Sequence, residues 1–368
     1  MMIFRRILPT TAVCVAALTA CQLFAQSKMD TDTATPPQAS ANEVILAVTV
    51  RDKHSDLVPN LSKSDFTLTN DGRPQVITKF TSATSLPLTL GVLVETSASL
   101  RGSLENERSA GGKFLDQMMT TPRVKAFLIQ FGGEVDLLAD VSPEKKKLDT
   151  AVGQIGTPQF HNTGDAQASV KAAGSTLYDA IYLASTELMK KQPERKVLIV
   201  LSDGIDRGSK TSLFSAIEAA QRANTAVYAM YFKGEEEGKN NSRSPGQQRR
   251  GRTGGGGPGG GYPSGYPGGG GGWPGGGGNR PSRPTEGSRM NGERILEQIC
   301  NETGGHMFEV NRKHPVEQAI ATISSELRAQ YIVGFTPDKQ TGGYSRITLK
   351  ANNKDLYVQT RQGYYAAE

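Results

Sequence analysis

The apolar run from Leu88 to Val94 is the feature that most limits what this chain can fold into. A short run rich in Leu and Val predicts a strand that is buried on both faces of a parallel sheet. The run is followed by Glu95, Ser97 and Ser99, whose side chains all carry oxygen. Open α/β sheets bind ligands at the carboxyl ends of their strands. Two interpretations stay open: the three side chains converge on a hard cation, or the serines cap the following helix.

A second apolar run, at 196–202, is followed by a second carboxylate, Asp203. Between the two runs, a Gly-Ser-Thr loop that ends in Thr176 precedes a predicted helix. Because the carboxyl ends of parallel strands meet at one edge of a sheet, Asp203 is expected beside Glu95. The sequence therefore offers oxygen ligands from three segments in the order Ser/Ser, Thr, Asp.

This order resembles the metal-ion-dependent adhesion site (MIDAS) of the von Willebrand factor A domain, which consists of Asp-x-Ser-x-Ser, a later Thr and a later Asp. More closely, the chain resembles the VWFA-related domain family described from acidobacteria, from about Ala41 to the C-terminal Gly-Tyr-Tyr. The resemblance implies that Ser97, Ser99 and Thr176 bind a Mg²⁺-like ion directly, while Asp203 acts through a water. It also implies a partner protein that presents a carboxylate to the open position of the ion.

Glu95 departs from the family pattern because it occupies the position of the first Asp. Its additional methylene moves the carboxylate, and Mg²⁺ demands near-ideal octahedral geometry with distances of about 2.0–2.1 Å. Three outcomes stay open for the metal site, which is formed by Glu95, Ser97, Ser99, Thr176 and Asp203. It binds Mg²⁺ weakly, it binds Ca²⁺ or Mn²⁺ instead, or it has lost its metal.

Strands and helices alternate between residues 86 and 337, which predicts an α/β fold. The expected sheet is doubly wound, mostly parallel and von Willebrand factor A-like, with helices on both faces. The strands are expected at 88–94, 124–131, 134–139, 196–202, 225–232 and 306–310, and the helices at 100–119, 143–154, 175–191, 211–223, 291–303 and 314–330. Because 124–131 and 134–139 meet with no room for a helix, one edge strand should be antiparallel.

Strands are also predicted at both ends of the chain, outside this A-like region. They are expected at 44–50, 65–69, 75–80, 345–350 and 356–361. The N-terminal part (43–84) holds the first three and the C-terminal part (338–368) the last two, and in each part the last two strands are predicted to form a hairpin. Since three strands alone are too few to be stable, the two parts are expected to combine into one small β-sandwich-like module.

The first 25 residues have the basic start and short apolar run of an export signal. The segment Leu18 to Cys21 resembles the bacterial lipobox, in which the Cys is lipidated and attaches the protein to a membrane. The alternative is ordinary cleavage near Ala25, which discards Cys21. Residues 26–42 are rich in Ser, Thr and Pro and are predicted to be a flexible tether. The expected location is the periplasm, the outer membrane or the cell surface.

The insert 234–290 is predicted to be disordered, because its Gly-rich and Arg-rich composition cannot bury enough apolar surface to form a core. Its eight basic and four acidic side chains give +4 of the formal net charge of +6, and Arg5 and Arg6 in the signal give the remaining +2. The basic balance therefore does not indicate a basic face on the folded body, and nucleic acid is not expected as a partner.

The sequence contains no Gly-x-Ser-x-Gly elbow, phosphate-binding loop, His-Glu-x-x-His helix or Cys-x-x-Cys pair. We therefore expect a non-enzymatic module that recognises a protein through a variant MIDAS, with the loops 132–134, 156–174 and 204–210 facing the partner. The alternative is a metal-free A-fold scaffold in an envelope assembly. A third hypothesis is a hydrolase that uses the same pocket. The sequence does not indicate the oligomeric state.

Overall fold

The computed structural model describes residues 43–100, 102–156, 174–193, 195–233, 291–338 and 343–365. The predicted export signal with Cys21, the tether and the insert 234–290 lie outside these residues, as does most of the loop 156–174. Within the described ranges, no helix combines the length and the apolar character that crossing a membrane requires.

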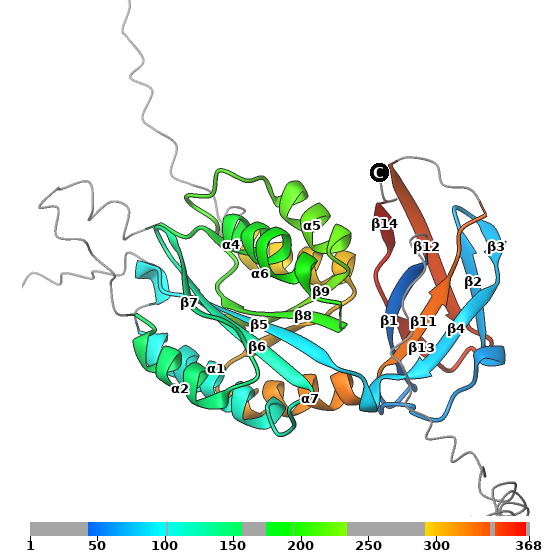
Figure 1. Ribbon diagram of the computed structural model, residues 1–368, viewed down its shortest axis with the longest axis horizontal. Coiled ribbons are helices and arrows are strands. Elements are labelled where there is room, and N and C mark those ends of the chain that lie inside the picture. The colour runs from blue at the N-terminus through cyan, green and yellow to red at the C-terminus, as the bar shows by residue number, and fades with distance from the viewer. Residues whose placement is uncertain are drawn as a thin grey trace, which may run out of the picture. The chain divides into compact units, whose positions relative to one another are not determined.

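The described residues of the A-like region form a six-stranded sheet with the strand order β10-β9-β8-β5-β6-β7 (Figure 1). In chain order its strands are β5 (Leu88–Glu95), β6 (Val124–Phe131), β7 (Val135–Ser142), β8 (Arg195–Ser202), β9 (Thr225–Phe232) and β10 (Met307–Val310). All neighbours pair in parallel except β7, which pairs antiparallel with β6 at one edge. Every residue of the central strand β5 is buried, as expected for a strand covered on both faces.

Helices cover both faces of this sheet (Figure 1). One face carries α1 (Leu104–Met118), α2 (Lys145–Gln154) and α7 (Val316–Ala329), and the other carries α4 (Leu177–Leu183), α5 (Leu213–Arg222) and α6 (Asn291–Thr303). Alternate residues of β5 point to opposite faces of the sheet. Val92 packs in the core under α1, and Leu93 packs in the core under α4. The predicted doubly wound, mostly parallel α/β fold with an antiparallel edge strand is confirmed.

The N- and C-terminal strands form the predicted β-sandwich-like module, which in the described residues has two four-stranded sheets. Their orders are β13-β1-β11-β4 and β14-β12-β2-β3. The strands are β1 (Val44–Arg51), β2 (Phe66–Asn70), β3 (Arg73–Gln75), β4 (Ile77–Ser82), β11 (Tyr331–Phe335), β12 (Tyr344–Ala351), β13 (Tyr357–Gln359) and β14 (Gly363–Tyr365). Apolar side chains from both sheets, among them Leu46 and Leu68, form a core of their own.

Both predicted hairpins differ from the observed pairing. The strand predicted at 75–80 is divided: β3 pairs with β2, whereas β4 crosses to the other sheet and pairs with β11. At the C-terminus, β12 pairs with β2 and β14, while β13 pairs with β1 in the opposite sheet. The turn residues correctly mark where the chain reverses. Which strands pair, however, depends on the apolar side chains that pack between the two sheets of the sandwich.

The strand β11 corrects the expected boundary of the A-like region. The region predicted at 86–337 includes these residues, but β11 lies in the sandwich between β1 and β4. Gln330 alone separates it from α7. The buried Gln330 side chain accepts a hydrogen bond from Arg195 Nη2 at 2.6 Å and donates one to the Tyr228 hydroxyl at 3.0 Å. The last helix of the A-like region is therefore followed directly by a strand of the sandwich, and no linker sequence separates the two modules.

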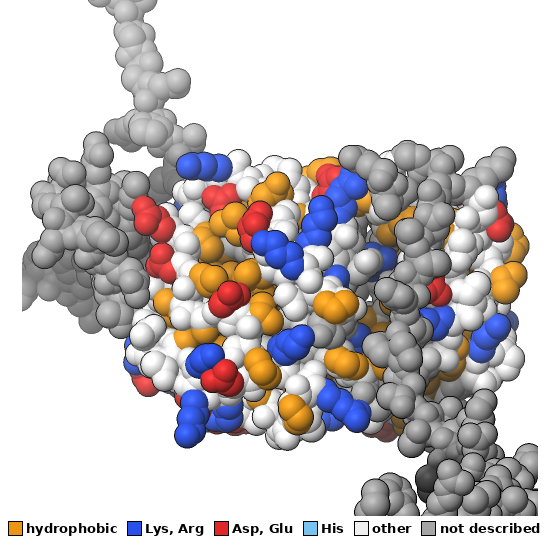
Figure 2. Space-filling model, in the orientation of Figure 1, with side chains coloured by type: hydrophobic (Ala, Val, Ile, Leu, Met, Phe, Trp, Pro, Cys, Tyr) orange, Lys and Arg blue, Asp and Glu red, His pale blue; other side chains and the backbone are white. Residues whose placement is uncertain are grey.

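Charged side chains are mixed on the face of the molecule drawn in Figure 2. Lys and Arg alternate with Asp and Glu over the helices of the A-like region, and no large patch of one sign is visible there. Neither sign of charge dominates this face.

Candidate metal centre

The candidate site lies at the carboxyl edge of the sheet, where two neighbouring strands end together. β5 pairs in parallel with β8, from Leu88 opposite Arg195 to Val94 opposite Leu201. Because the register is continuous, Glu95 and Asp203 end up beside each other although more than a hundred residues separate them. This is the edge at which open α/β sheets bind ligands.

A chain of buried hydrogen bonds joins three of the predicted residues. Ser99 Oγ donates to Asp203 Oδ2 at 2.8 Å, and Ser97 Oγ lies 2.9 Å from Ser99 Oγ. Because Ser99 gives its one proton to Asp203, Ser97 is the donor of the second bond. The alternative that the serines cap the following helix is wrong, since α1 begins only at Leu104 and their hydroxyls bind each other and Asp203.

Glu95 is fully buried beside this chain, and its two oxygens have different surroundings. Oε2 accepts hydrogen bonds from Ser202 Oγ at 2.5 Å and from the backbone N–H of Asp203 at 3.2 Å. Oε1 has no hydrogen-bond partner among the described residues. The side chain therefore ties the end of β5 to the end of β8 with one oxygen and leaves the other without a protein partner.

The surroundings of Glu95 disfavour its negative charge. Burial, and after it the charge of Asp203, raise the pKa of Glu95 to about 7. The hydrogen bond from the Ser202 hydroxyl lowers this pKa, but its effect is smaller. A cation at this position would stabilise the carboxylate, because an opposite charge nearby favours the ionised form.

Thr176 stands at the N-cap position of α4 but does not cap it. Its side chain makes no capping hydrogen bond, it is 5% exposed, and Oγ1 has no partner among the described residues. The first N–H groups of α4 are bound by the loop after β8 instead. Asp206 Oδ2 accepts from Tyr178 N at 3.1 Å. Ser209 Oγ accepts from Asp179 N at 3.0 Å. Helix capping therefore does not explain the Thr176 hydroxyl.

The loop after β8 is held closely in place around Asp203. The Asp179 carboxylate accepts hydrogen bonds from the backbone N–H groups of Lys210 at 3.0 Å and Thr211 at 2.8 Å. Gly204 has a φ of 73°, and a Cβ atom there would lie 2.1 Å from the carbonyl oxygen of Gly292 in α6. Only glycine suits this approach, which fixes the backbone directly after Asp203.

Three further polar residues of the site were not identified from the sequence. Ser202 donates its hydroxyl hydrogen to Glu95. Ser175 Oγ is buried near Glu95 and has no hydrogen-bond partner among the described residues. Glu107 is fully buried in α1, and neither of its carboxylate oxygens has a partner among the described residues. The signal for Glu107 was present in the sequence, because an acidic residue interrupts the apolar face of α1 that includes Ala110 and Phe114.

The donor set fits a hard divalent cation. Every group at the site is a carboxylate or a hydroxyl, and Mg²⁺, Ca²⁺ and Mn²⁺ prefer such oxygen ligands. Buried polar atoms without a protein partner, here Glu95 Oε1 and Thr176 Oγ1, are rare unless an ion or water satisfies them. The described residues contain no group of three or more Asp, Glu, His and Cys side chains that could hold an ion by itself. An ion at this site would therefore need hydroxyl ligands as well.

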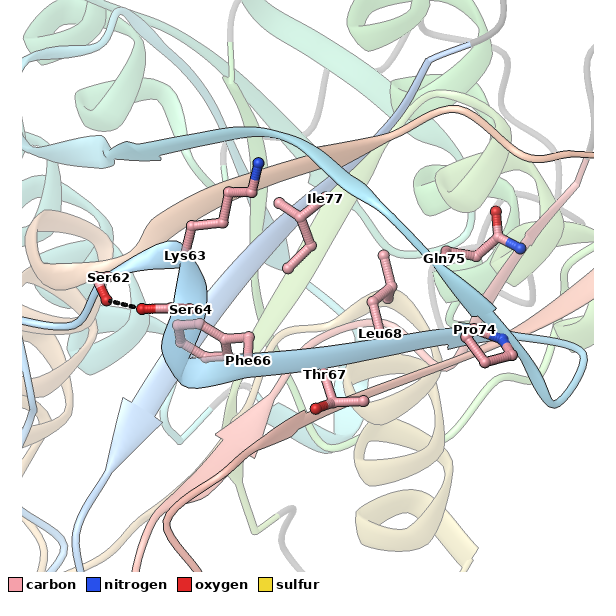
Figure 3. A pocket seen from close by; sticks show the side chains of 9 residues that line it. All are labelled: Ser62, Lys63, Ser64, Phe66, Thr67, Leu68, Pro74, Gln75 and Ile77. Carbon is pink, nitrogen blue, oxygen red and sulfur yellow. Dashed lines mark hydrogen bonds between the residues drawn. The ribbon is translucent and has the colours of Figure 1, made fainter.

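A groove in the sandwich module, of about 520 Å³, is separate from this site. It is lined by Ser62, Lys63, Ser64, Phe66, Thr67, Leu68, Pro74, Gln75 and Ile77 (Figure 3). Lys63 is the one charged residue of this lining. The groove has no carboxylate, so it does not compete with the strand ends as a metal centre.

No family model and no curated protein matches the sequence. Among solved structures, the chain is similar to an aerotolerance-related membrane protein from Bacteroides fragilis, at 17% identity and a TM-score of 0.41 over 65% of this chain and 98% of that one. It is similar to BatB from Bacteroides thetaiotaomicron, at 15% identity and a TM-score of 0.39 over 65% and 97%.

A third similarity is to proximal thread matrix protein 1 from the mussel byssus, in a structure with a zinc-occupied MIDAS motif. It has 14% identity and a TM-score of 0.33 and covers 42% of this chain and 37% of that one. All three similarities are weak. The strand order of this chain, with five parallel strands, an antiparallel edge strand and helices on both faces, agrees with the von Willebrand factor A-like fold that the sequence resemblance implies.

Proposed function

We propose that this protein is an exported, non-enzymatic binding module of the cell envelope that recognises a partner protein through a metal ion held at a variant MIDAS. Ser97, Ser99 and Thr176 bind the ion directly, and Asp203 acts through a water, as in the family that the sequence resembles. Glu95 takes the position of the first Asp of the motif.

One observation carries the proposal. At the ends of β5 and β8, a hydrogen-bonded chain that includes Ser99 and Asp203 lies beside buried oxygens that have no protein partner in the described residues. Two of these oxygens, Glu95 Oε1 and Thr176 Oγ1, belong to residues of the predicted metal site. A divalent cation is the simplest group that satisfies them together, because it binds carboxylate and hydroxyl oxygens alike.

A carboxylate of the partner would fill the remaining position of the ion. A hard cation and an anionic oxygen attract each other strongly, and the fixed coordination geometry adds orientation to the affinity. The loops 132–134 and 204–210 are proposed to contact the partner. Both are at this edge of the sheet: a Cβ at Gly132 would lie 3.0 Å from Thr96 Oγ1, and Gly204 directly follows Asp203.

Attachment to the envelope is proposed through lipidation of Cys21, with ordinary cleavage near Ala25 as the alternative. A lipidated chain would remain with the membrane fraction, and Cys21→Ala would release it. The location that follows is the periplasm or the outer-membrane surface.

Thermal unfolding tests the metal centre. The protein is measured in chelator and then with Mg²⁺, Ca²⁺ or Mn²⁺. An ion present at about 100 times its Kd should stabilise the fold by about 2.7 kcal/mol. Thr176→Val removes the hydroxyl at similar volume and should abolish this gain. Thr150→Val, at an exposed position of α2, is the matched control and should keep it.

The coordination position of the ion that a partner carboxylate would fill is tested in a separate experiment. Bound Mn²⁺ with an exchangeable water enhances the relaxation of water protons, and acetate should lower this enhancement if a carboxylate takes the position. An ion that stabilises the fold without responding to acetate would contradict carboxylate recognition. If no ion stabilises the parent protein, the alternative of a metal-free A-fold scaffold is favoured. The bonds of Glu95 to the end of β8 favour that alternative, since they join the strand ends without an ion.

A further inference from the structure

Glu107 is the buried charged group that the proposed function leaves unexplained. It belongs to the first turns of α1 and has no exposed surface. Neither Oε1 nor Oε2 has a hydrogen-bond partner among the described residues. A carboxylate taken out of water without a partner costs several kcal/mol, so an isolated Glu in a core is selected against unless something binds it.

The position of α1 brings Glu107 close to the strand ends. The helix packs on β5, because a Cβ atom at Gly111 would lie 3.6 Å from Val92 and 3.8 Å from Val94. Glu107 is one helical turn before Gly111, on the side towards the carboxyl end of β5. Burial, and after it the charges of Glu95 and Asp203, raise the pKa of Glu107 well above its usual range. Three carboxylates therefore act on one another at this edge.

No described side chain donates a hydrogen bond to the Glu107 carboxylate. Ser103, whose backbone oxygen accepts from Glu107 N at 2.9 Å, contributes no side-chain hydrogen bond to the carboxylate. Like-charged Glu95 and Asp203 make the position worse for a negative charge as long as no cation is present. A cation near these groups would favour their ionised forms.

We propose that Glu107 is a positioning residue of the metal centre, which accepts hydrogen bonds from water bound to the cation and so increases the affinity of the site for ions that retain water. This inference rests on the proposed metal centre. Action through water fits the described residues, in which Asp, Glu, His and Cys side chains form no group of three or more that could hold an ion.

The role of Glu107 determines which ion the site prefers. Mg²⁺ gives up its water reluctantly and usually keeps several molecules, whereas Ca²⁺ accepts more protein oxygens at longer distances. A carboxylate that acts through bound water therefore helps Mg²⁺ more than Ca²⁺. This compensates for Glu95, whose longer side chain is less suited to the compact shell of Mg²⁺.

The test is calorimetric titration of the full chain with Mg²⁺ and with Ca²⁺, without any partner protein. Glu107→Gln keeps the shape and removes the charge. It should weaken Mg²⁺ binding at least tenfold and Ca²⁺ binding clearly less. Glu105→Gln is the matched control on the same helix, since the Glu105 side chain is 81% exposed, and both affinities should remain unchanged.

Unfolding in chelator provides the second readout. Glu107→Gln should melt at the same temperature as the parent or higher, because it removes a buried carboxyl group that has no hydrogen-bond partner among the described residues. Glu107→Met, an apolar residue of similar volume, should behave in the same way if the amide does not fold.

Two outcomes would overturn the inference, and they can be told apart. If the parent binds Mg²⁺ and Glu107→Gln binds it equally well, Glu107 has no role at the ion while the proposed metal centre stands. If the parent binds neither ion, the metal centre and the role of Glu107 both fail.

Discussion

The two oxygens of Glu95 have different surroundings. One oxygen joins β5 to β8 through Ser202 and the backbone of Asp203, and the other has no partner among the described residues. The Glu95 carboxylate is fully buried beside the Asp203 carboxylate, which is unfavourable in the absence of a cation.

The stability of the metal-free protein should depend on Glu95 and pH. Its pKa in the folded protein is about 7 against a reference value of 4.5. A raised folded-state pKa stabilises the fold below the unfolded pKa, and this contribution is lost as pH rises through the folded value. In chelator, the free energy of unfolding should therefore fall by roughly 3 kcal/mol between pH 5 and pH 8.

Denaturant unfolding of the parent and of Glu95→Gln at these two pH values checks this. The amide does not titrate, so the variant should lose much less stability than the parent. An equal loss in both proteins would assign the pH dependence to other groups.

Among the structural elements, the loop after β8 decides where Asp203 lies. Its backbone is bound to α4 through Asp179, and at Gly204 it approaches α6 more closely than a side chain permits. The loop thus joins a strand and two helices at the candidate site, and its geometry depends on one glycine.

Gly204→Ala should destabilise the protein by about 3 kcal/mol or more. The positive φ of 73° costs an L-residue about 1–2 kcal/mol, and the new methyl group would clash with the Gly292 carbonyl. Gly72→Ala is the matched control, because Gly72 has a φ of 76° but open space around it. Denaturant unfolding of Gly72→Ala should show only the loss of about 1–2 kcal/mol that the positive φ causes. Equal losses would contradict the close approach of Gly204 to α6.

At the scale of the whole described body, buried polar side chains join the A-like region to the sandwich. Arg361, from the segment between β13 and β14, donates from Nη1 to the carbonyl of Gln221 in α5 at 3.1 Å. From Nη2 it donates to the carbonyl of Ile45 in β1, also at 3.1 Å. Gln330 makes a second connection. The two modules therefore share buried hydrogen bonds, and we expect them to unfold together.

Arg361→Met should lower the free energy of unfolding by about 3 kcal/mol, because it removes two hydrogen bonds from a charged donor, each worth about 1.5–3 kcal/mol. It should also weaken cooperativity, so that the sandwich strand β1 exchanges amide hydrogens before β5 does. Arg346→Met, at an exposed position of β12, is the control and should change little. Synchronous exchange of β1 and β5 in Arg361→Met would show that Arg361 does not link the modules.

The sequence by itself determined the elements and their class. Apolar runs such as 88–94 and 196–202 have the composition of doubly covered strands, and alternation with amphipathic helices leaves few arrangements other than a parallel sheet. Polar residues that directly follow such strands must meet at one edge. For this reason Glu95, Ser97, Ser99 and Asp203 could be placed together before the fold was known. Thr176 followed from the same order of segments.

The tertiary structure alone decided which strands pair and which buried groups meet. Turn residues near Gly72 mark a reversal, but only packing across the sandwich sends β4 and β13 into the sheet of β1. β11 follows α7 without a linker, so nothing local assigns it to the sandwich. Glu107 is visible in the sequence as an acid on an apolar helix face. Its meaning depends on where α1 lies over β5, because local periodicity fixes the face of a helix but not what that face contacts.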